Sequence, residues 1–161
     1  MSQSLATQET IVLPGDTNAH DTLFGGLLMK RIDECAAISA RRHCLCPVVT
    51  ASNDGVHFHQ PIQRDDIVTL VSYVCSVGRS SMEVFVKILT EKGDGGKEIA
   101  AVSFLTFVAL GTDGRPTEVP FVEPGSEQEK ILFNEREVRK AARHKKRDET
   151  DALIKSLTSQ I

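Results

Sequence analysis

One stretch of this chain decides how the rest can fold: Gly25-Gly26-Leu27-Leu28-Met29-Lys30-Arg31-Ile32-Asp33-Glu34-Cys35-Ala36-Ala37-Ile38-Ser39-Ala40-Arg41-Arg42. Two neighbouring stripes of a helix run through it, one made of Leu28, Ile32, Cys35 and Ser39 and the other of Met29, Asp33, Ala36 and Ala40. A helix that is apolar over most of its circumference is typical of a protein interior. The spacing therefore predicts a buried helix over residues 25–42.

Segments rich in β-forming residues follow this helix, and we expect strands over residues 48–58, 67–77, 82–89 and 99–110. Ahead of the helix, Ile11-Val12-Leu13 predicts a short edge strand, preceded by a frayed end at residues 1–10. Short connections favour antiparallel pairing, and such a sheet can bury one face by wrapping around the single apolar helix. The fold class is therefore α+β. Unpaired sheet edges also predict an oligomer.

The charge pattern changes in the last part of the chain. Residues 112–126 have the prolines of a loop, and from Glu127 the pattern is helical and strongly charged. One helical stripe there is basic and consists of Arg136, Arg139, Lys140, Arg143 and Arg147. We expect one domain over residues 1–125 and a basic helical tail over residues 126–161.

Composition narrows the class of protein. The net charge of -3 and the lack of aromatic residues among the basic ones argue against nucleic-acid binding. No apolar run reaches the ~20 residues of a membrane span, and the first ten residues do not have the pattern of a signal peptide. The four cysteines form no C-x-x-C pair, which favours free thiols and a cytoplasmic protein. His57 and His59 lack a third ligand at a convincing spacing, so we expect no metal.

The run from Asp16 to Asp33 resembles a signature of the hotdog-fold acyl-CoA hydrolases, in which a loop with Asn leads through Gly-Gly into a helix that bears an acid. The likeness extends over residues 11–120. It implies a hotdog fold, hydrolysis of fatty acyl-CoA thioesters, and dimers that assemble into hexamers. Coenzyme A is then part of the substrate, and no separate cofactor is expected. Asp21 stands where relatives usually have glycine, a departure that bears on substrate preference.

Three kinds of residue are candidates for catalysis. The first N–H groups of the helix, at Gly25 and Gly26, can hold the thioester oxygen, or these glycines can serve close packing only. Asp33 can act as a base or a nucleophile, or it can form a salt bridge to Arg31 or Arg42. Asn18 can orient a water molecule or bind a carbonyl, or it can shape an Asx turn. The resemblance implies that Asn18 and Asp33 of one active site come from opposite protomers.

Two further segments match those that contact coenzyme A in the family, and they comprise Ala51, Ser52 and Asn53, and Arg79, Ser80, Ser81 and Met82. In the basic tail, Arg143 and Lys145 are candidates for binding the nucleotide phosphates, or the tail is a solvated helix packed over a neighbouring protomer. Two other functions compete with hydrolysis. An acyl-CoA sensor needs neither Asn18 nor Asp33, and the motifs of hotdog hydratases differ from Asn-x(6)-Gly-Gly-x(6)-Asp.

Overall fold

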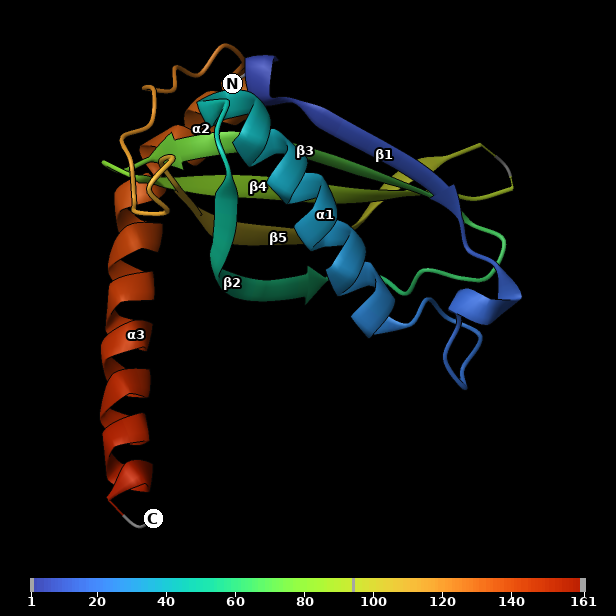
Figure 1. Ribbon diagram of the computed structural model, residues 1–161. Helices are drawn as coiled ribbons and strands as arrows, with labels where there is room; N and C mark the ends of the chain where they lie inside the picture. The colour runs from blue at the N-terminus through green and yellow to red at the C-terminus, as the bar shows by residue number, and fades with distance from the viewer. Residues whose placement is uncertain (1, 94, 160–161) are drawn as a thin grey trace.

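The computed structural model describes residues 2–93 and 95–159, in which a five-stranded antiparallel sheet wraps around helix α1 (Gly25–Cys44) (Figure 1). The strands are β1 (Ala6–Ile11), β2 (Val48–Phe58), β3 (Ile67–Val77), β4 (Ser81–Glu91) and β5 (Lys97–Ala109). Short 3-10 helices cover Ser2–Ser4 and Pro14–Asp16, and the chain ends in α2 (Glu127–Asn134) and α3 (Arg136–Thr158). The expected α+β class and the hotdog arrangement are confirmed.

The order of strands in the sheet is β1-β3-β4-β5-β2. β3, β4 and β5 pair with their neighbours in the chain, as short connections predict. β2 does not pair with β3, because the chain crosses the molecule after β2 and leaves that strand beside β5 at the far edge of the sheet. One edge of β2 therefore has no partner strand among the residues that the structure describes.

The first strand differs from the expectation. β1 runs from Ala6 to Ile11 and pairs with β3 along its whole length, so the prediction of a frayed end followed by a strand at Ile11-Val12-Leu13 was wrong. The strand is mostly polar and therefore has no apolar alternation, and its stability comes from backbone pairing with the edge of β3. Val12 lies just past the strand and is fully buried.

The core lies between α1 and the concave face of the sheet. Leu28, Ile32 and Cys35 are fully buried on the inner side of α1. Val84, Val86 and Ile88 of β4 point at the helix, while Glu83 and Phe85 point to the outer face, as their alternation predicts. Full burial of a side chain the size of leucine contributes about 1.5–3 kcal/mol, so these contacts determine which way α1 lies on the sheet.

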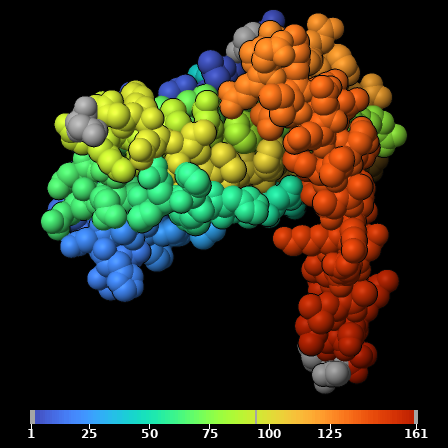
Figure 2. Space-filling view, turned by 180° about the vertical axis from the view of Figure 1, so that it is seen from behind, coloured from blue at the N-terminus to red at the C-terminus, as the bar shows by residue number. Residues whose placement is uncertain are grey.

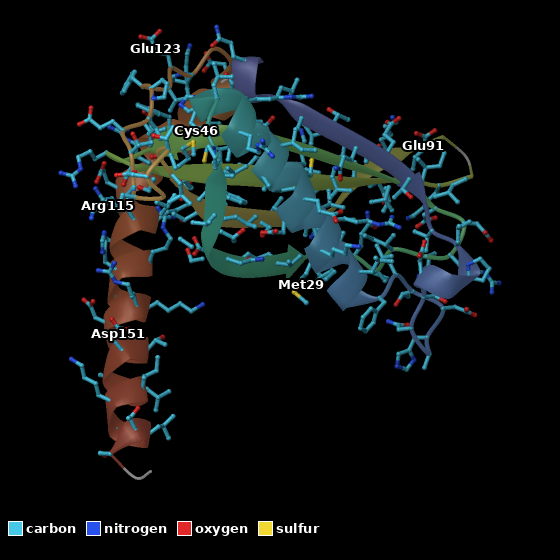
Figure 3. All side chains as sticks on the ribbon, in the orientation of Figure 1. Met29, Cys46, Glu91, Arg115, Glu123 and Asp151 are labelled. Carbon is cyan, nitrogen blue, oxygen red and sulfur yellow. The ribbon has the colours of Figure 1, made fainter. Side chains whose placement is uncertain are left out.

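The expected buried helix packs on the sheet through one side only, and its opposite side is open to solvent. Met29 is 49% exposed and Ile38 is 36% exposed. The sheet wraps one side of the helix only, because a single sheet of this size cannot enclose its whole circumference. Met29 projects from α1 beside the end of β2 (Figure 3). An apolar surface next to an unpaired strand edge is a feature that a second protein chain can cover.

Candidate active site

Asp33 lies on α1 and is partly buried. The hydroxyl of Thr50, on the edge strand β2, donates a hydrogen bond of 2.8 Å to Asp33 Oδ1. Neither of the expected salt bridges forms: Arg31 pairs with Asp16 at 3.4 Å, and Arg42 donates to the carbonyl oxygen of Leu5. The hydrogen bond holds one carboxylate oxygen and leaves Oδ2 able to accept from another group.

Helix α1 begins at Gly25, as predicted, and its start carries no side-chain cap. Among residues 2–93 and 95–159, neither the amide of Gly25 nor that of Gly26 has a hydrogen-bond acceptor. A Cβ at Gly25 would meet nothing within 4 Å, whereas one at Gly26 would lie 2.7 Å from the ring of Phe24. Two amides at the positive end of a helix dipole are suited to binding a carbonyl oxygen or an oxyanion.

Asn18 shapes its own loop. Its side-chain oxygen accepts from the backbone N–H of His20 at 2.8 Å, and its amide nitrogen donates to the Thr22 hydroxyl at 2.9 Å. This is the Asx turn that the sequence left open as an alternative. Asn18 also lines a cavity of about 340 Å³ together with Gly25, Phe58 and others. Asn18 thus both stabilises its own loop and lines the cavity.

The two expected catalytic side chains do not meet within one chain. No hydrogen bond or ion pair in the described part of the protein joins Asn18 to Asp33, and Asp33 does not line the 340 Å³ cavity. Asn18 precedes α1, whereas Asp33 lies two turns into the helix beside β2. A site that uses both residues therefore requires a second protomer or a change in shape.

Asp21 occupies a left-handed backbone conformation, with φ of 56°. Aspartate tolerates this region better than most residues other than glycine. Its carboxylate lies 3.4 Å from the Arg64 guanidinium, and the Arg64 N–H donates to its carbonyl oxygen at 3.2 Å. Asp21 thus adopts the left-handed conformation of this loop, and its contacts with Arg64 connect the Asn18 loop to the segment before β3.

A second cavity, of about 480 Å³, lies between the sheet and α3 and brings together most of the residues expected to bind coenzyme A. Ala51, Ser52, Asn53 and Ser81 line the sheet side, and Lys140, Arg143, Lys146 and Arg147 line the helix side. Asp54 and Glu83 also line it. Hydroxyl groups and cationic side chains that face one cavity form a suitable surface for phosphate groups.

Glu83 anchors α3 to the outer face of the sheet. This carboxylate is 3% exposed, accepts from Arg139 at 2.8 Å and 3.0 Å, and also accepts from Arg143. Burial alone would raise the pKa of Glu83, but the hydrogen bonds and positive charges of the two arginines outweigh it and lower that pKa below its ordinary value. Arg143 also pairs with Asp54 at 3.3 Å, so its charge is largely neutralised by its own chain.

Several expected contacts with coenzyme A are not brought to the second cavity. Lys145 lies on the other side of α3 from Arg143, because two residues are separated by about 200° on a helix, and its side chain is 80% exposed. The side chain of Met82 is fully buried in the core and faces α1, so only its backbone can reach a ligand. Arg79 and Ser80 use backbone carbonyls to bind Val119 and Ala109.

Two contacts of the candidate site, made by Thr50 and Glu83, were not expected from the sequence. Thr50 stood within the quoted family likeness at Val49-Thr50-Ala51-Ser52, but nothing local shows that its hydroxyl meets a residue of α1. Glu83 alternates with the apolar residues of β4 as a solvent-facing residue would, and the basic stripe of α3 was the available sign of a partner. The Glu83 contact joins β4 to α3, which lie far apart in the chain, and the Thr50 contact joins two consecutive elements whose packing local patterns do not give.

Residues 2–93 and 95–159 contain neither a metal-binding cluster of side chains nor a membrane-spanning helix. No group of three or more His, Cys, Asp or Glu side chains there could hold a metal ion. No helix in this part of the chain is long and apolar enough to span a bilayer. Cys35, Cys44, Cys46 and Cys75 are free thiols.

A long helix wrapped by a five-stranded antiparallel sheet is the hotdog arrangement. The family model of the Thioesterase superfamily matches residues 20–97. An uncharacterized acyl-CoA thioester hydrolase of Bacillus subtilis is 49% identical over 96% of this chain and 91% of its own length. The cytosolic acyl coenzyme A thioester hydrolase of Rattus norvegicus is 34% identical over 84% of the chain, which spans 36% of that longer protein.

Solved structures of acyl-CoA hydrolases are also similar to this chain. The acyl-CoA hydrolase of Staphylococcus aureus, in complex with butyryl coenzyme A, has a TM-score of 0.94 at 43% identity, covering 98% of this chain and 97% of its own. Its variants with one Asp, Asn or Thr replaced by alanine also match. A hexameric acyl-CoA thioesterase has a TM-score of 0.87 at 40% identity, covering 90% of this chain and 94% of its own. The chain belongs to the acyl-CoA thioester hydrolases of the Thioesterase superfamily.

Proposed function

We propose that this protein hydrolyses the thioester bond of fatty acyl-CoA to a free fatty acid and coenzyme A, with Asp33 as the group that activates water. The observation that carries the proposal is the hydrogen bond from Thr50 to Asp33, which orients the carboxylate. In the Staphylococcus aureus hydrolase, the Asn, Asp and Thr that were replaced by alanine follow one another with the same spacing as Asn18, Asp33 and Thr50.

The proposed reaction uses the negative carboxylate of Asp33 as a base and the amide N–H groups of Gly25 and Gly26 to bind the developing negative charge. Asp33 Oδ2 accepts a proton from water as the water attacks the thioester carbonyl carbon. The amides of Gly25 and Gly26 bind the carbonyl oxygen, where negative charge develops in the transition state. The tetrahedral intermediate then collapses, the carbon–sulfur bond breaks, and the coenzyme A thiolate takes up the proton that Asp33 had accepted from water, which returns Asp33 to its carboxylate form. Asn18 orients the water or the carbonyl.

The site is completed, in this proposal, by a second protomer. Among the described residues no hydrogen bond or ion pair joins Asn18 to Asp33. Met29 is exposed beside the end of β2 (Figure 3), and the exposed Phe58 is the last residue of that strand. Pairing of two β2 edges would cover these side chains and continue the sheet. We propose a dimer formed in this way and the assembly of three such dimers into a hexamer; the relative described as a hexameric acyl-CoA thioesterase supports the number of chains.

The nucleotide of coenzyme A is assigned to the 480 Å³ cavity. Lys140, Lys146 and Arg147 have cationic side chains there that form no ion pair with a described acid, whereas Arg143 is already paired. Glu137 and Asp151 also line this cavity. Residues 1–125 then form the thioesterase domain, and residues 126–161 form the tail that walls the nucleotide site. We also propose a cytoplasmic protein, supported by its four free thiols.

Steady-state release of free thiol from a series of fatty acyl-CoA thioesters tests the activity. We expect turnover with the native chain and loss of turnover with Asp33→Asn. Binding of acyl-CoA without any release of thiol would identify a sensor instead. Addition of water to an enoyl-CoA, with no thiol released, would identify a hydratase.

A further inference from the structure

The second half of α3 leaves the body of the protein. α3 has 23 residues and is therefore about 34 Å long, but its bonds to the sheet come from Arg139 and Arg143 near its start. From His144 to Ser159 every residue is exposed. In the described residues after Arg143, the hydrogen bonds and ion pairs of α3 stay within the helix.

The free half of α3 carries an apolar patch. Leu153, Ile154 and Leu157 are exposed to between 54% and 58%, and their spacing places them on one side of the helix. Isolated helices of this length are marginal in water, and most helices in proteins are stabilised by packing of an apolar side. In the described residues, the patch lies beyond the part of α3 that lines the cavity and forms no hydrogen bond or ion pair with the sheet, so it is expected to pack on another surface.

The position of the patch identifies that surface. α3 crosses the outer face of the sheet beside β2 and continues past the β2 edge, so that its second half lies beyond the last strand (Figures 1 and 2). Asp151 (Figure 3) is the last residue of α3 along the chain that lines the cavity shared with the sheet, and the apolar patch begins two residues beyond it. A second copy of the chain that pairs at the β2 edge would occupy the space that α3 enters.

We propose that the second half of α3 is an arm that packs, through Leu153, Ile154 and Leu157, on a second copy of this chain seated at the β2 edge. By two-fold symmetry the arm of the second copy packs on the first. The arm and the nucleotide cavity share one helix, so the contact between protomers also fixes the helix that supplies Lys146 and Arg147 to the cavity. The inference concerns assembly and does not depend on the reaction catalysed.

The test compares two double variants of the full-length chain. Leu153→Gln with Leu157→Gln replaces two apolar residues of the patch. Ala152→Gln with Ser156→Gln introduces the same two glutamines on the neighbouring row of the helix and leaves the patch intact. Glutamine is a good helix former, and circular dichroism confirms that the helix is retained. Sedimentation velocity over a range of concentrations then reports the oligomer. We expect the patch variant to dissociate at concentrations at least tenfold higher than the control variant does.

A second measurement locates the contact. A benzophenone amino acid placed at position 154 is irradiated in the otherwise native protein, and the products are separated by mass. We expect adducts of two chains, with the attached peptide drawn from the sheet of the second copy. Adducts within one chain only, equal dissociation of the two double variants, or a native chain that stays monomeric at all concentrations would each overturn the proposal. Thiol release from acyl-CoA is assayed separately, so that loss of assembly is distinguished from an error in the proposed reaction.

Discussion

Thr50 donates its hydroxyl hydrogen to Oδ1 of Asp33 across 2.8 Å and so joins the helix α1 to the edge strand β2. The two residues belong to elements that are consecutive in the chain, yet the contact forms only because β2 lies at the far edge of the sheet. An oriented carboxylate beside an open strand edge is the arrangement on which the following predictions rest.

Replacing Asp33 by Asn removes the proton acceptor while keeping the size of the side chain. We expect kcat for acyl-CoA to fall by about two to four orders of magnitude, as is usual for loss of a general base. The matched control is Glu34→Gln, which removes the adjacent exposed acid and should leave kcat nearly unchanged. Near-native turnover by a folded Asp33→Asn protein would rule out the assignment.

Replacing Thr50 by Val keeps the shape of the side chain and removes its hydroxyl. Because Asp33 then loses the bond that orients it, we expect kcat to fall by about one to two orders of magnitude with little change in KM. Thr50→Ser keeps a hydroxyl and should restore most of the activity. If serine and valine behave alike, the hydroxyl does not position Asp33.

A site shared between protomers can be tested by mixing inactive chains. Asn18→Ala and Asp33→Asn each damage every site in their own homodimers, but a mixed dimer has one site with both native residues. We expect activity to return on mixing, towards about one quarter of the native value for random exchange with each dimer containing two sites. Exchange of labelled subunits without any return of activity would contradict the shared site.

The nucleotide site can be tested with two substrates. Lys140→Gln with Lys146→Gln removes charges that line the second cavity, and we expect KM for an acyl-CoA to rise, with each contact worth about 1 kcal/mol and weaker in salt. A pantetheine thioester lacks the nucleotide and should be unaffected. Lys145→Gln, on the far side of the helix, is the control. Equal effects on both substrates would assign the charges to structure.

The buried Glu83 predicts a dependence of stability on pH. Its pKa is lowered in the folded protein, so the pair with Arg139 and Arg143 stabilises fully above the ordinary pKa of glutamate. As the pH falls below that value, the unfolded chain takes up a proton before the folded one, and the stability is lost through the lowered pKa. Urea unfolding at several pH values should show this loss, and Glu83→Gln should abolish it.

The same Glu83→Gln variant measures how much the ion pairs of Glu83 contribute to the free energy of unfolding. Glu83→Gln leaves two partly buried arginines without their carboxylate, and we expect a cost of about 3–5 kcal/mol at neutral pH. Glu91→Gln, which breaks a more exposed pair with Lys97, should cost less than about 1 kcal/mol. Similar losses in the two variants would show that the Glu83 cluster does not anchor α3.

The helices and strands could largely be predicted from the sequence, because periodicity and turn residues act over short distances. Residues 48–58 and 67–77 are strands with the expected bounds, and α1 starts at Gly25 as its glycines and apolar stripe indicate. The likeness at residues 16–33 also led to the family. Where local signals were weak the prediction failed, as in the polar β1, whose pairing partner lies some sixty residues away.

The contacts between residues of different helices and strands follow from the tertiary structure and could not be predicted from local patterns. The pairing of β2 with β5 at the edge of the sheet places Thr50 beside Asp33, and α3 returns to the sheet to place Arg139 on Glu83. A residue two positions away can lie on the far side of a helix, so the structure separates Lys145 from Arg143 although the sequence grouped them. Contacts between distant segments depend on the path of the whole chain, because many arrangements of the same helices and strands satisfy the same local patterns, and packing selects among them.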